Sequence, residues 1–157
     1  MQIRRATEKD IEGVGRLLVQ VNMVHHEGRP DLFNGPAQKY NAEQLMDIFE
    51  DDDRPVFIAA DDRDQVMGYV FCVFQQHIRD SIMTEIRTLY IDDLCVDEKI
   101  RGQHIGQKLY QYVLDYARQH GCHNVTLHVW SCNTSAMKFY EKCGLKPQYV
   151  SMEQVLE

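Results

Sequence analysis

The segment Arg101-Gly102-Gln103-His104-Ile105-Gly106 decides the fold class of this chain. It joins a strand-like run, residues 88–96, to a helix-like run, residues 106–120. A short glycine-containing loop that leads into a helix presents unpaired backbone N–H groups at the positive end of the helix dipole. The segment therefore indicates a strand–loop–helix unit that can hold an anion such as a pyrophosphate. The alternative is that the glycines serve only a tight turn, since neither a Walker loop nor a dinucleotide fingerprint is present.

Outward from this segment, the chain alternates strand-like and helix-like stretches without an internal repeat. Runs rich in branched and aromatic residues predict strands, and apolar residues spaced three and four apart predict helices. The predicted strands are residues 3–6, 56–60, 66–74, 88–96, 124–130 and 149–156, and the predicted helices are 10–25, 41–49, 106–120 and 133–144. The order β-α-α-β-β-β-α-β-α-β predicts an α/β sandwich around a mixed sheet, and we expect residues 1–157 to form one domain.

The composition is that of an ordinary globular protein and argues against several classes. The 157 residues are 44% hydrophobic and carry a net charge of −7, which disfavours a nucleic-acid partner bound through phosphate neutralisation. The same charge suits a small cationic partner, although only weakly. No apolar run approaches the roughly 20 residues of a membrane-spanning helix, so we expect no membrane partner.

The five cysteines and the first residues indicate a cytoplasmic protein. The cysteines are odd in number and form no C-x-x-C pair, so they predict neither a disulfide framework nor a zinc site, and no other metal site is indicated. The first seven residues lack the apolar stretch of a secretory signal. We therefore expect a cytoplasmic location and no metal.

A second segment, residues 133–145, reads N-T-S-A-M-K-F-Y-E-K-C-G-L. The spacing places Ala136, Phe139, Tyr140 and Cys143 on one face of the helix predicted there. Tyr140 then has a packed ring and a hydroxyl at the edge of that face. A tyrosine that only fills the core is the alternative.

The two segments together resemble the GNAT superfamily of N-acetyltransferases. Residues 101–106 look like its R/Q-x-x-G-x-G/A loop, and residues 133–145 look like its N-x-x-A-x-x-F-Y-x-x-x-G-F segment. Two positions depart from the pattern: His104 replaces the first motif glycine, and Leu145 replaces the final phenylalanine. The resemblance implies a mixed, mostly antiparallel sheet with helices on both faces, acetyl-CoA as co-substrate and no metal.

Carried onto this sequence, the resemblance implies a role for each motif. Tyr140 would be the general acid for the leaving thiolate. The backbone of residues 94–96 would hold the pantetheine arm, the loop after it the pyrophosphate, and the Asn133 side chain the rest of the CoA arm. The implied cofactor-binding residues are Leu94, Cys95, Val96, Arg101, Gly102, Gln103, His104, Ile105, Gly106, Gln107 and Asn133. At His104 we expect an ordinary negative φ, because a residue with a Cβ disfavours the left-handed region.

Attack on a thioester requires a neutral amine, yet alkylamines are protonated near neutral pH, so the site must accept a proton. Asp92 and Asp93, directly before residue 94, are the candidates for catalysis and substrate binding, alongside a water chain. Adjacent strand residues face opposite sides, so only one is expected to point into a given cleft. Residues 90–96 resemble the acidic strand of spermidine/spermine N-acetyltransferases, where the first acidic residue serves the amine, which favours Asp92. The alternative for both is a solvated strand end.

The loop after the first predicted helix offers two further candidates for substrate contact, His26 and Arg29. The alternative is a turn around Pro30 and Asp31 in which Arg29 pairs locally. His128 is interpreted as a structural histidine, and Cys132 as a nucleophile only in a minor alternative, because no activating partner is adjacent in sequence.

These observations predict an enzyme that moves an acetyl group directly to a primary amine of a small, polyamine-like cation. An aminoglycoside and a protein amino group are rival acceptors. A non-catalytic acyl-CoA-binding regulatory module is a rival of a different class. A homodimer is possible, since dimers are frequent in the family that the chain resembles.

Overall fold

A computed structural model describes residues 1–156, and five strands form its one sheet, in the order β1-β2-β3-β4-β5. The strands are β1 (Gln2–Arg5), β2 (Val56–Ala60), β3 (Val66–Gln76), β4 (Arg87–Val96) and β5 (Asn124–Leu127). Strands β1 to β4 pair antiparallel with their neighbours, and β5 pairs parallel with β4. The predicted α/β class with a mixed, mostly antiparallel sheet is confirmed.

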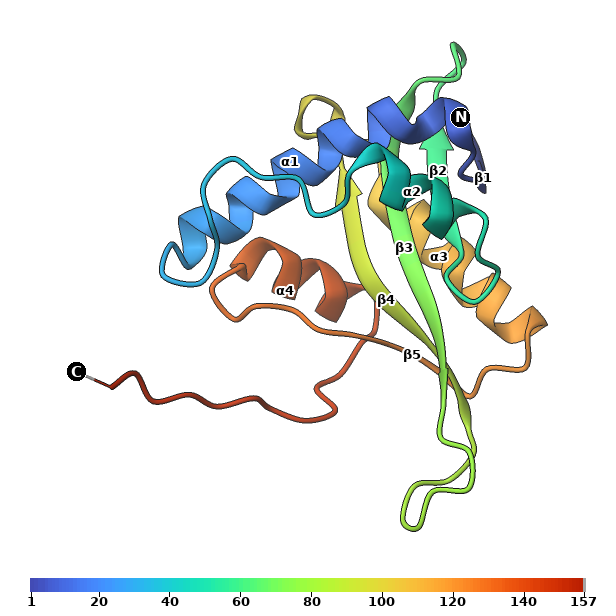
Figure 1. Ribbon diagram of the computed structural model, residues 1–157, viewed down its shortest axis with the longest axis vertical. Helices are drawn as coiled ribbons and strands as arrows, with labels where there is room; N and C mark the ends of the chain where they lie inside the picture. The colour runs from blue at the N-terminus through green and yellow to red at the C-terminus, as the bar shows by residue number, and fades with distance from the viewer. Residues whose placement is uncertain (157) are drawn as a thin grey trace.

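Helices cover both faces of this sheet (Figure 1). They are α1 (Ile11–Gly28), α2 (Ala42–Phe49), α3 (Ile105–Gln119) and α4 (Thr134–Lys142), with short 3-10 turns at Glu8–Asp10 and Glu98–Ile100. Helix α2 begins where it does because the Asn41 side chain accepts a hydrogen bond from the Gln44 N–H, and the Gln44 side chain accepts one from the Asn41 N–H, both at 2.9 Å.

The sheet separates two hydrophobic cores. All five residues of β2 are buried, because side chains of α1 and α2 pack on one face of the sheet and side chains of α3 pack on the other. Val56 and Ile58 pack in the α1/α2 core, whereas Phe57 and Ala59 pack in the α3 core. The continuous apolar run of residues 56–60 is thus explained by burial on both sides.

The predicted last strand, residues 149–156, is wrong. After Gly144, which has φ +101, residues 146–156 run extended away from the body without forming a strand (Figure 1). The predicted strand 124–130 is also shorter than expected, ending at Leu127. Alternating apolar residues favour a strand, but a strand exists only where a neighbour completes its hydrogen bonds, and the described chain supplies none there.

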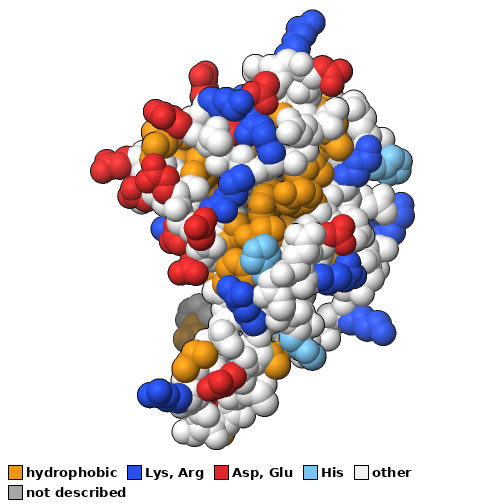
Figure 2. Space-filling view, turned by 90° about the vertical axis from the view of Figure 1, so that its right-hand side faces the viewer, with side chains coloured by type: hydrophobic (Ala, Val, Ile, Leu, Met, Phe, Trp, Pro, Cys, Tyr) orange, Lys and Arg blue, Asp and Glu red, His pale blue; other side chains and the backbone are white. Residues whose placement is uncertain are grey.

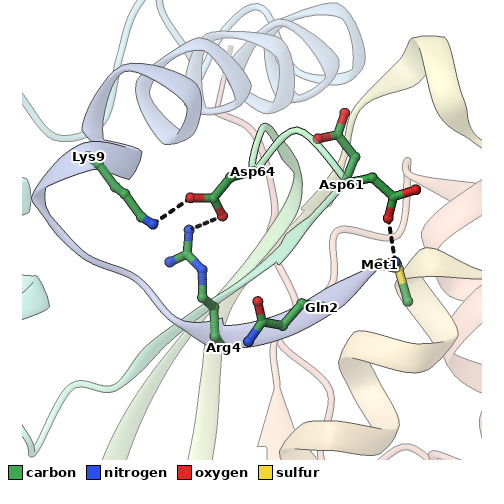
Figure 3. Close-up of a pocket in the computed structure, with 7 residues that line it drawn as sticks. Met1, Gln2, Arg4, Lys9, Asp61 and Asp64 are labelled. Atoms are coloured by element: carbon green, nitrogen blue, oxygen red, sulfur yellow. Dashed lines mark hydrogen bonds and ion pairs between the residues drawn. The ribbon is translucent and has the colours of Figure 1, made fainter.

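A polar pocket at the end of the sheet away from α4 is occupied by ion pairs (Figure 3). Asp64, in the turn between β2 and β3, binds both Arg4 and Lys9, and the amino group of Met1 contacts Asp62. Arg4 also holds the buried Asp10 at 2.8 Å. These pairs tie the start of the chain to the hairpin.

The molecular surface carries charges of both signs. The face in Figure 2 has acidic and basic side chains side by side, with no continuous basic stripe. Within residues 1–156, no helix combines the length and apolar character needed to cross a membrane.

Candidate active site

Strands β4 and β5 pair over only part of the length of β4. The ladder joins Thr88 to Asn124 at one end and Ile91 to Leu127 at the other. Beyond Ile91, β4 continues to Val96 with β3 as its only partner among the described strands. The backbone of Leu94, Cys95 and Val96 is therefore open on the β5 side, where its N–H and C=O groups are available to a ligand.

The loop before α3 presents a cluster of free amides. The N–H groups of residues 102–107 donate no hydrogen bond to any residue of the described chain, and the first amide of this region with a partner is that of Lys108, which binds the His104 carbonyl at 3.0 Å. Gly102, with φ +91, turns the chain so that these groups lie at the start of α3. Arg101 and Gln103 are exposed beside them. The arrangement suits an anion, because the amides and the helix dipole act together.

His104 does not have the ordinary negative φ that we expect from its side chain. Its φ is +59, in the left-handed region, and its side chain makes no capping hydrogen bond to α3. His104 thus has a backbone conformation that favours glycine although a Cβ is present, at a cost of roughly 1–2 kcal/mol.

Gly106 sets the distance between α3 and α4. A Cβ added there would lie 3.3 Å from the Phe139 ring, which is tighter than ordinary van der Waals contact. Asn133 begins α4 by accepting a hydrogen bond from the Ala136 N–H at 3.2 Å. Close packing and this cap fix α4 beside the open part of β4.

Tyr140 on α4 has a hydroxyl that holds its proton strongly. Burial, with a contribution from the negative charge of Asp93, raises its pKa well above the ordinary value of a tyrosine. No hydrogen-bond partner for this hydroxyl occurs among residues 1–156. Its protonated form is therefore maintained at neutral pH, as a proton donor requires.

Asp93 is a carboxyl group whose surroundings raise its pKa. Burial raises its pKa to about 6, although the Tyr69 hydroxyl, which donates to Asp93 Oδ2 at 2.7 Å, acts in the opposite direction. The charge of Lys39 also lowers this pKa, and that of Asp92 raises it. A carboxylate with such a pKa is ionised near neutral pH and can still take up a proton.

Asp92 is bound by groups from the segment before α2. Its Oδ2 accepts hydrogen bonds from Lys39 Nζ at 3.0 Å and from the Tyr40 hydroxyl at 3.3 Å. The Asp92 side chain is 23% exposed and that of Lys39 48%. The Asp92 side chain is thus partly exposed, whereas Tyr69, whose hydroxyl binds Asp93, is buried.

A β-bulge brings both carboxylates to one face of the sheet. Phe71 pairs with Asp93 and Cys72 with Ile91, so Asp92 has no opposite residue. Phe71 belongs to the α1/α2 core, and both hydroxyl partners contact it: the Tyr40 ring at 5.7 Å and the Tyr69 ring at 5.0 Å between centroids. The expectation that only one of the two aspartates points to a given side is therefore wrong, because it assumed a regular strand.

Lys39, Tyr40 and Tyr69 are the residues that sequence reasoning missed at this site. Lys39 and Tyr40 lie in a loop without periodicity, so no sequence signal relates them to β4. Tyr69 lies on a correctly predicted strand, but only the strand register places it opposite the acidic pair.

His26 and Arg29 are engaged locally. His26 Nδ1 lies 2.7 Å from the Phe33 carbonyl oxygen, and Arg29 binds both oxygens of Asp31 at 2.8–2.9 Å. Arg29 also pairs with Glu153. Within residues 1–156, no interaction joins His26 or Arg29 to Asp92 or Asp93.

His128 bridges two tyrosines close to the end of β5. Its Nδ1 lies 3.3 Å from the Tyr90 hydroxyl, and its Nε2 contacts the Tyr149 hydroxyl. Both ring nitrogens are therefore occupied, in keeping with a structural histidine. The hydrogen bond to Tyr149 also attaches the start of the exposed C-terminal segment beside β5.

The cysteines nearest to β4 are poor nucleophiles. Cys95 is buried, and burial raises its pKa to about 12. Cys72 is also buried, and its pKa is raised for the same reason. Neither thiol is poised as a thiolate near neutral pH.

Comparison with known proteins places this geometry in a family. The sequence model of the "Acetyltransferase (GNAT) family" matches residues 21–145. A glucosamine 6-phosphate N-acetyltransferase of Arabidopsis thaliana is 28% identical over 57% of this chain and 66% of its own length. A peptidyl-lysine N-acetyltransferase, YjaB, of Salmonella typhimurium is 27% identical over 73% of this chain and 65% of its own. The chain thus spans slightly less than two thirds of these curated relatives.

Solved structures agree with the sequence match. A single-residue mutant of the BH1408 protein of Bacillus halodurans has a TM-score of 0.95 and 31% identity, with all of both chains covered. The split between β4 and β5, the free amides before α3 and the tyrosine on α4 thus occur in a chain whose sequence and fold both match one family. This protein belongs to the GNAT family of acetyltransferases.

Proposed function

We propose that this protein transfers the acetyl group of acetyl-CoA directly to the primary amine of a small cationic molecule. The observation that carries the proposal is the bulge in β4, which places Asp92 and Asp93 on one face of the sheet. The negative charge of Asp93 contributes to the raised pKa of Tyr140. A proton acceptor and a proton donor thus lie in one region. Acetyl transfer to an ammonium group needs both.

The residues present fit acetyl-CoA. The free amides of residues 102–107 and the exposed Arg101 offer hydrogen bonds and positive charge to the pyrophosphate. The open backbone of residues 94–96 would pair with the amide groups of the pantetheine arm. Asn133 already uses its side-chain oxygen to cap α4, so its NH₂ group is the part left for the CoA arm. When bound, acetyl-CoA supplies an acetyl group activated as a thioester.

Two side chains of this protein would transfer protons during the reaction. Asp93 would take the proton that the acceptor ammonium must lose, because its pKa of about 6 leaves it ionised at neutral pH. We prefer Asp93 to Asp92 here, since Asp92 already accepts hydrogen bonds from Lys39 and Tyr40. Tyr140 would donate the proton that the departing sulfur requires, and the second proton, which the nitrogen loses as the amide forms, would restore the Tyr140 hydroxyl. The raised pKa of the Cys95 thiol supports direct transfer rather than an acyl-cysteine route.

The charged and aromatic groups around Asp92 support the proposed acceptor class. Two carboxylates within an aromatic setting favour a cation, as a polyamine-like acceptor requires. Lys39 already places an ammonium group on Asp92, so such an acceptor would displace it. The two curated relatives described above are named for an amino sugar phosphate and a lysine side chain, both of which present a primary amine.

The test is an acceptor panel read by mass spectrometry. Purified protein is incubated with acetyl-CoA and, separately, a polyamine, an amino sugar phosphate, a lysine peptide and an aminoglycoside. We expect one acetyl group on the polyamine, with CoA release in equal amount. Acetylation of another amine would keep the chemistry and overturn the acceptor class. Binding of acetyl-CoA with the thioester left intact by every amine would instead indicate a binding module.

A further inference from the structure

Lys39 is a primary amine that already lies on a carboxylate of the proposed acceptor site. It belongs to the connection between α1 and α2, which runs on the same side of the sheet as those helices (Figure 1). Its Nζ donates a hydrogen bond to Asp92 Oδ2 at 3.0 Å and lies 5.3 Å from the centre of the Tyr40 ring. A carboxylate and an aromatic ring are groups that bind an alkylammonium ion. Lys39 thus occupies the position that the proposed function gives to a substrate.

The backbone on both sides of Lys39 is held in place. Two residues later, Asn41 caps α2 through reciprocal hydrogen bonds with Gln44, both at 2.9 Å. Earlier in the connection, the Asn22 side chain on α1 donates to the Gly35 carbonyl at 2.9 Å. The Lys39 side chain itself is flexible and 48% exposed. Its amine can therefore change position near β4 without any change in the fold.

Lys39 shares its charge with both aspartates of β4. Burial lowers the pKa of Lys39, but the hydrogen bond and the charge of Asp92 raise it further, so the amine is protonated near neutral pH. A base must then remove a proton before the nitrogen can attack a thioester. The Lys39 charge also acts on Asp93, the base of the proposed function, and lowers the pKa of that carboxyl group. One base can thus serve Lys39 and an external amine.

Lys9 provides the comparison within the same chain. Within residues 1–156, it is the other lysine that forms an ion pair, and its partner is Asp64. This pair lies in the polar pocket at the end of the sheet away from α4, and thus away from Tyr140 (Figure 3). We propose, on the basis of the proposed function, that the enzyme acetylates its own Lys39 in cis when acetyl-CoA is bound and no external acceptor occupies Asp92.

The step forms one bond and breaks one. Asp93 would take a proton from the Lys39 ammonium group, and the nitrogen lone pair would form a bond to the acetyl carbonyl carbon. The C–S bond would break with its electron pair on sulfur, which would take the proton of the Tyr140 hydroxyl. The second proton lost by the nitrogen would restore Tyr140, and the proton on Asp93 would pass to solvent. The products are Lys39 acetylated at Nζ, CoA and one proton.

The first experiment incubates the full-length protein with acetyl-CoA and no acceptor, and locates added acetyl groups by peptide mass spectrometry. We expect one acetyl group on Lys39, with CoA released in equal amount. Acetylation of Lys39 should be about 10²-fold faster than that of Lys9, because general acid–base catalysis acts only at Lys39. Tyr140→Phe should remove this difference, and Lys39→Arg should abolish the CoA release. The matched control Lys9→Arg should change neither. Equal rates at Lys39 and Lys9, or a Lys39 rate that Tyr140→Phe leaves unchanged, would mean uncatalysed acetylation and would overturn the proposal.

The second experiment tests whether the reaction occurs within one molecule. The rate of Lys39 acetylation per molecule should be the same at several protein concentrations. A rate that rises with protein concentration would show transfer between molecules and would overturn the reaction in cis. The best acceptor of the panel, at saturating concentration, should slow acetylation of Lys39, because both amines require Asp92. No slowing would overturn the shared position.

The placement of Lys39 is also testable without acetyl-CoA. In the protein alone, Asp92→Asn should lower the pKa of Lys39 and so speed its reaction with an amine-specific reagent, while Lys9 reacts at an unchanged rate. An unchanged rate at Lys39 would show that its amine does not lie on Asp92, and it would overturn the proposal.

The acceptor panel distinguishes failure of this inference from failure of the proposed function. Acetylation of a panel amine by a protein whose Lys39 stays unmodified would overturn this inference and leave the proposed function standing. Acetylation of Lys39 with every panel amine unmodified would support this inference and overturn the small-molecule acceptor. Transfer to neither would overturn both.

Discussion

The two sides of the candidate site are built in different ways. The side proposed for acetyl-CoA consists of consecutive residues, 101–107, and the groups that it offers are mostly backbone amides. The side proposed for the acceptor consists of side chains from separate segments: Asp92 and Asp93 on β4, Tyr69 on β3, and Lys39 before α2. Backbone groups are present whatever the side chain, so the first side tolerates a histidine at a glycine position. The second side depends on each side chain and on the bulge that orients it.

This difference predicts that single substitutions lower activity more on the acceptor side and at the proton donor than in the loop. The largest effect is expected at Tyr140. Tyr140→Phe removes the proton donor while keeping the ring, so kcat should fall about 10²–10⁴-fold, with the KM for acetyl-CoA nearly unchanged. Steady-state kinetics with the best acceptor of the panel measures this. A kcat equal to that of the natural protein would return Tyr140 to a packing role.

The next effect separates the two aspartates. Asp93→Asn should lower kcat/KM about 10²-fold. For the natural protein we expect kcat/KM to rise as the pH increases through about 6, where Asp93 loses its proton, and the substitution should remove that rise. Asp92→Asn is the matched control and should keep that rise. Equal, small losses in both variants would contradict the assignment of Asp93.

The same substitution has a consequence for stability. The pKa of Asp93 is raised in the folded state from 3.8 to about 6, so between these values the folded protein holds a proton that the unfolded chain has lost. Stability due to this group therefore falls as the pH rises through that window. At pH 8 the free energy of unfolding of Asp93→Asn should exceed that of the natural protein by at most about 3 kcal/mol. Urea unfolding at pH 4 and pH 8 tests it, because the difference should be small at pH 4.

A smaller effect is expected at Lys39. Its ammonium group occupies Asp92, and a partly exposed pair of this kind is worth up to about 1 kcal/mol. Lys39→Met should therefore lower the KM for a cationic acceptor by up to about fivefold without changing the KM for acetyl-CoA. Lys39→Arg, which keeps the charge, is the control. A higher KM in Lys39→Met would show that Lys39 binds the acceptor rather than competing with it.

The smallest effect is expected in the loop. His104→Gly relieves a left-handed histidine and should raise the free energy of unfolding by about 1 kcal/mol. Acetyl-CoA binding should stay within about tenfold, because the backbone amides are unchanged. His104→Ala keeps the Cβ and should gain no stability. Thermal unfolding and calorimetric titration measure the two quantities, and a binding loss well beyond tenfold would show that the imidazole is itself a ligand.

Much of the fold was predictable from local sequence. The strand 56–60 was predicted with its observed bounds, because burial on both faces leaves a short, wholly apolar run. Asn41 and Asn133 were predicted as helix starts and are the N-caps of α2 and α4, because capping depends on residues three positions away. Residues 149–156 show the limit of this reasoning. Their alternating apolar side chains are typical of a strand, but strand pairing requires a neighbour that local sequence does not reveal.

The sequence by itself determined the family, the loop before α3 and the position of Tyr140, because each depends on residues close together in the chain. Only the tertiary structure decided that Asp92 and Asp93 share one face, that Lys39 lies on Asp92, and that Tyr69 binds Asp93. These contacts join residues 24 to 53 positions apart. They depend on strand register and on one unpaired residue in β4. The physical reason is that a bulge moves a side chain to the other face of a sheet, and no local sequence pattern predicts where the bulge occurs.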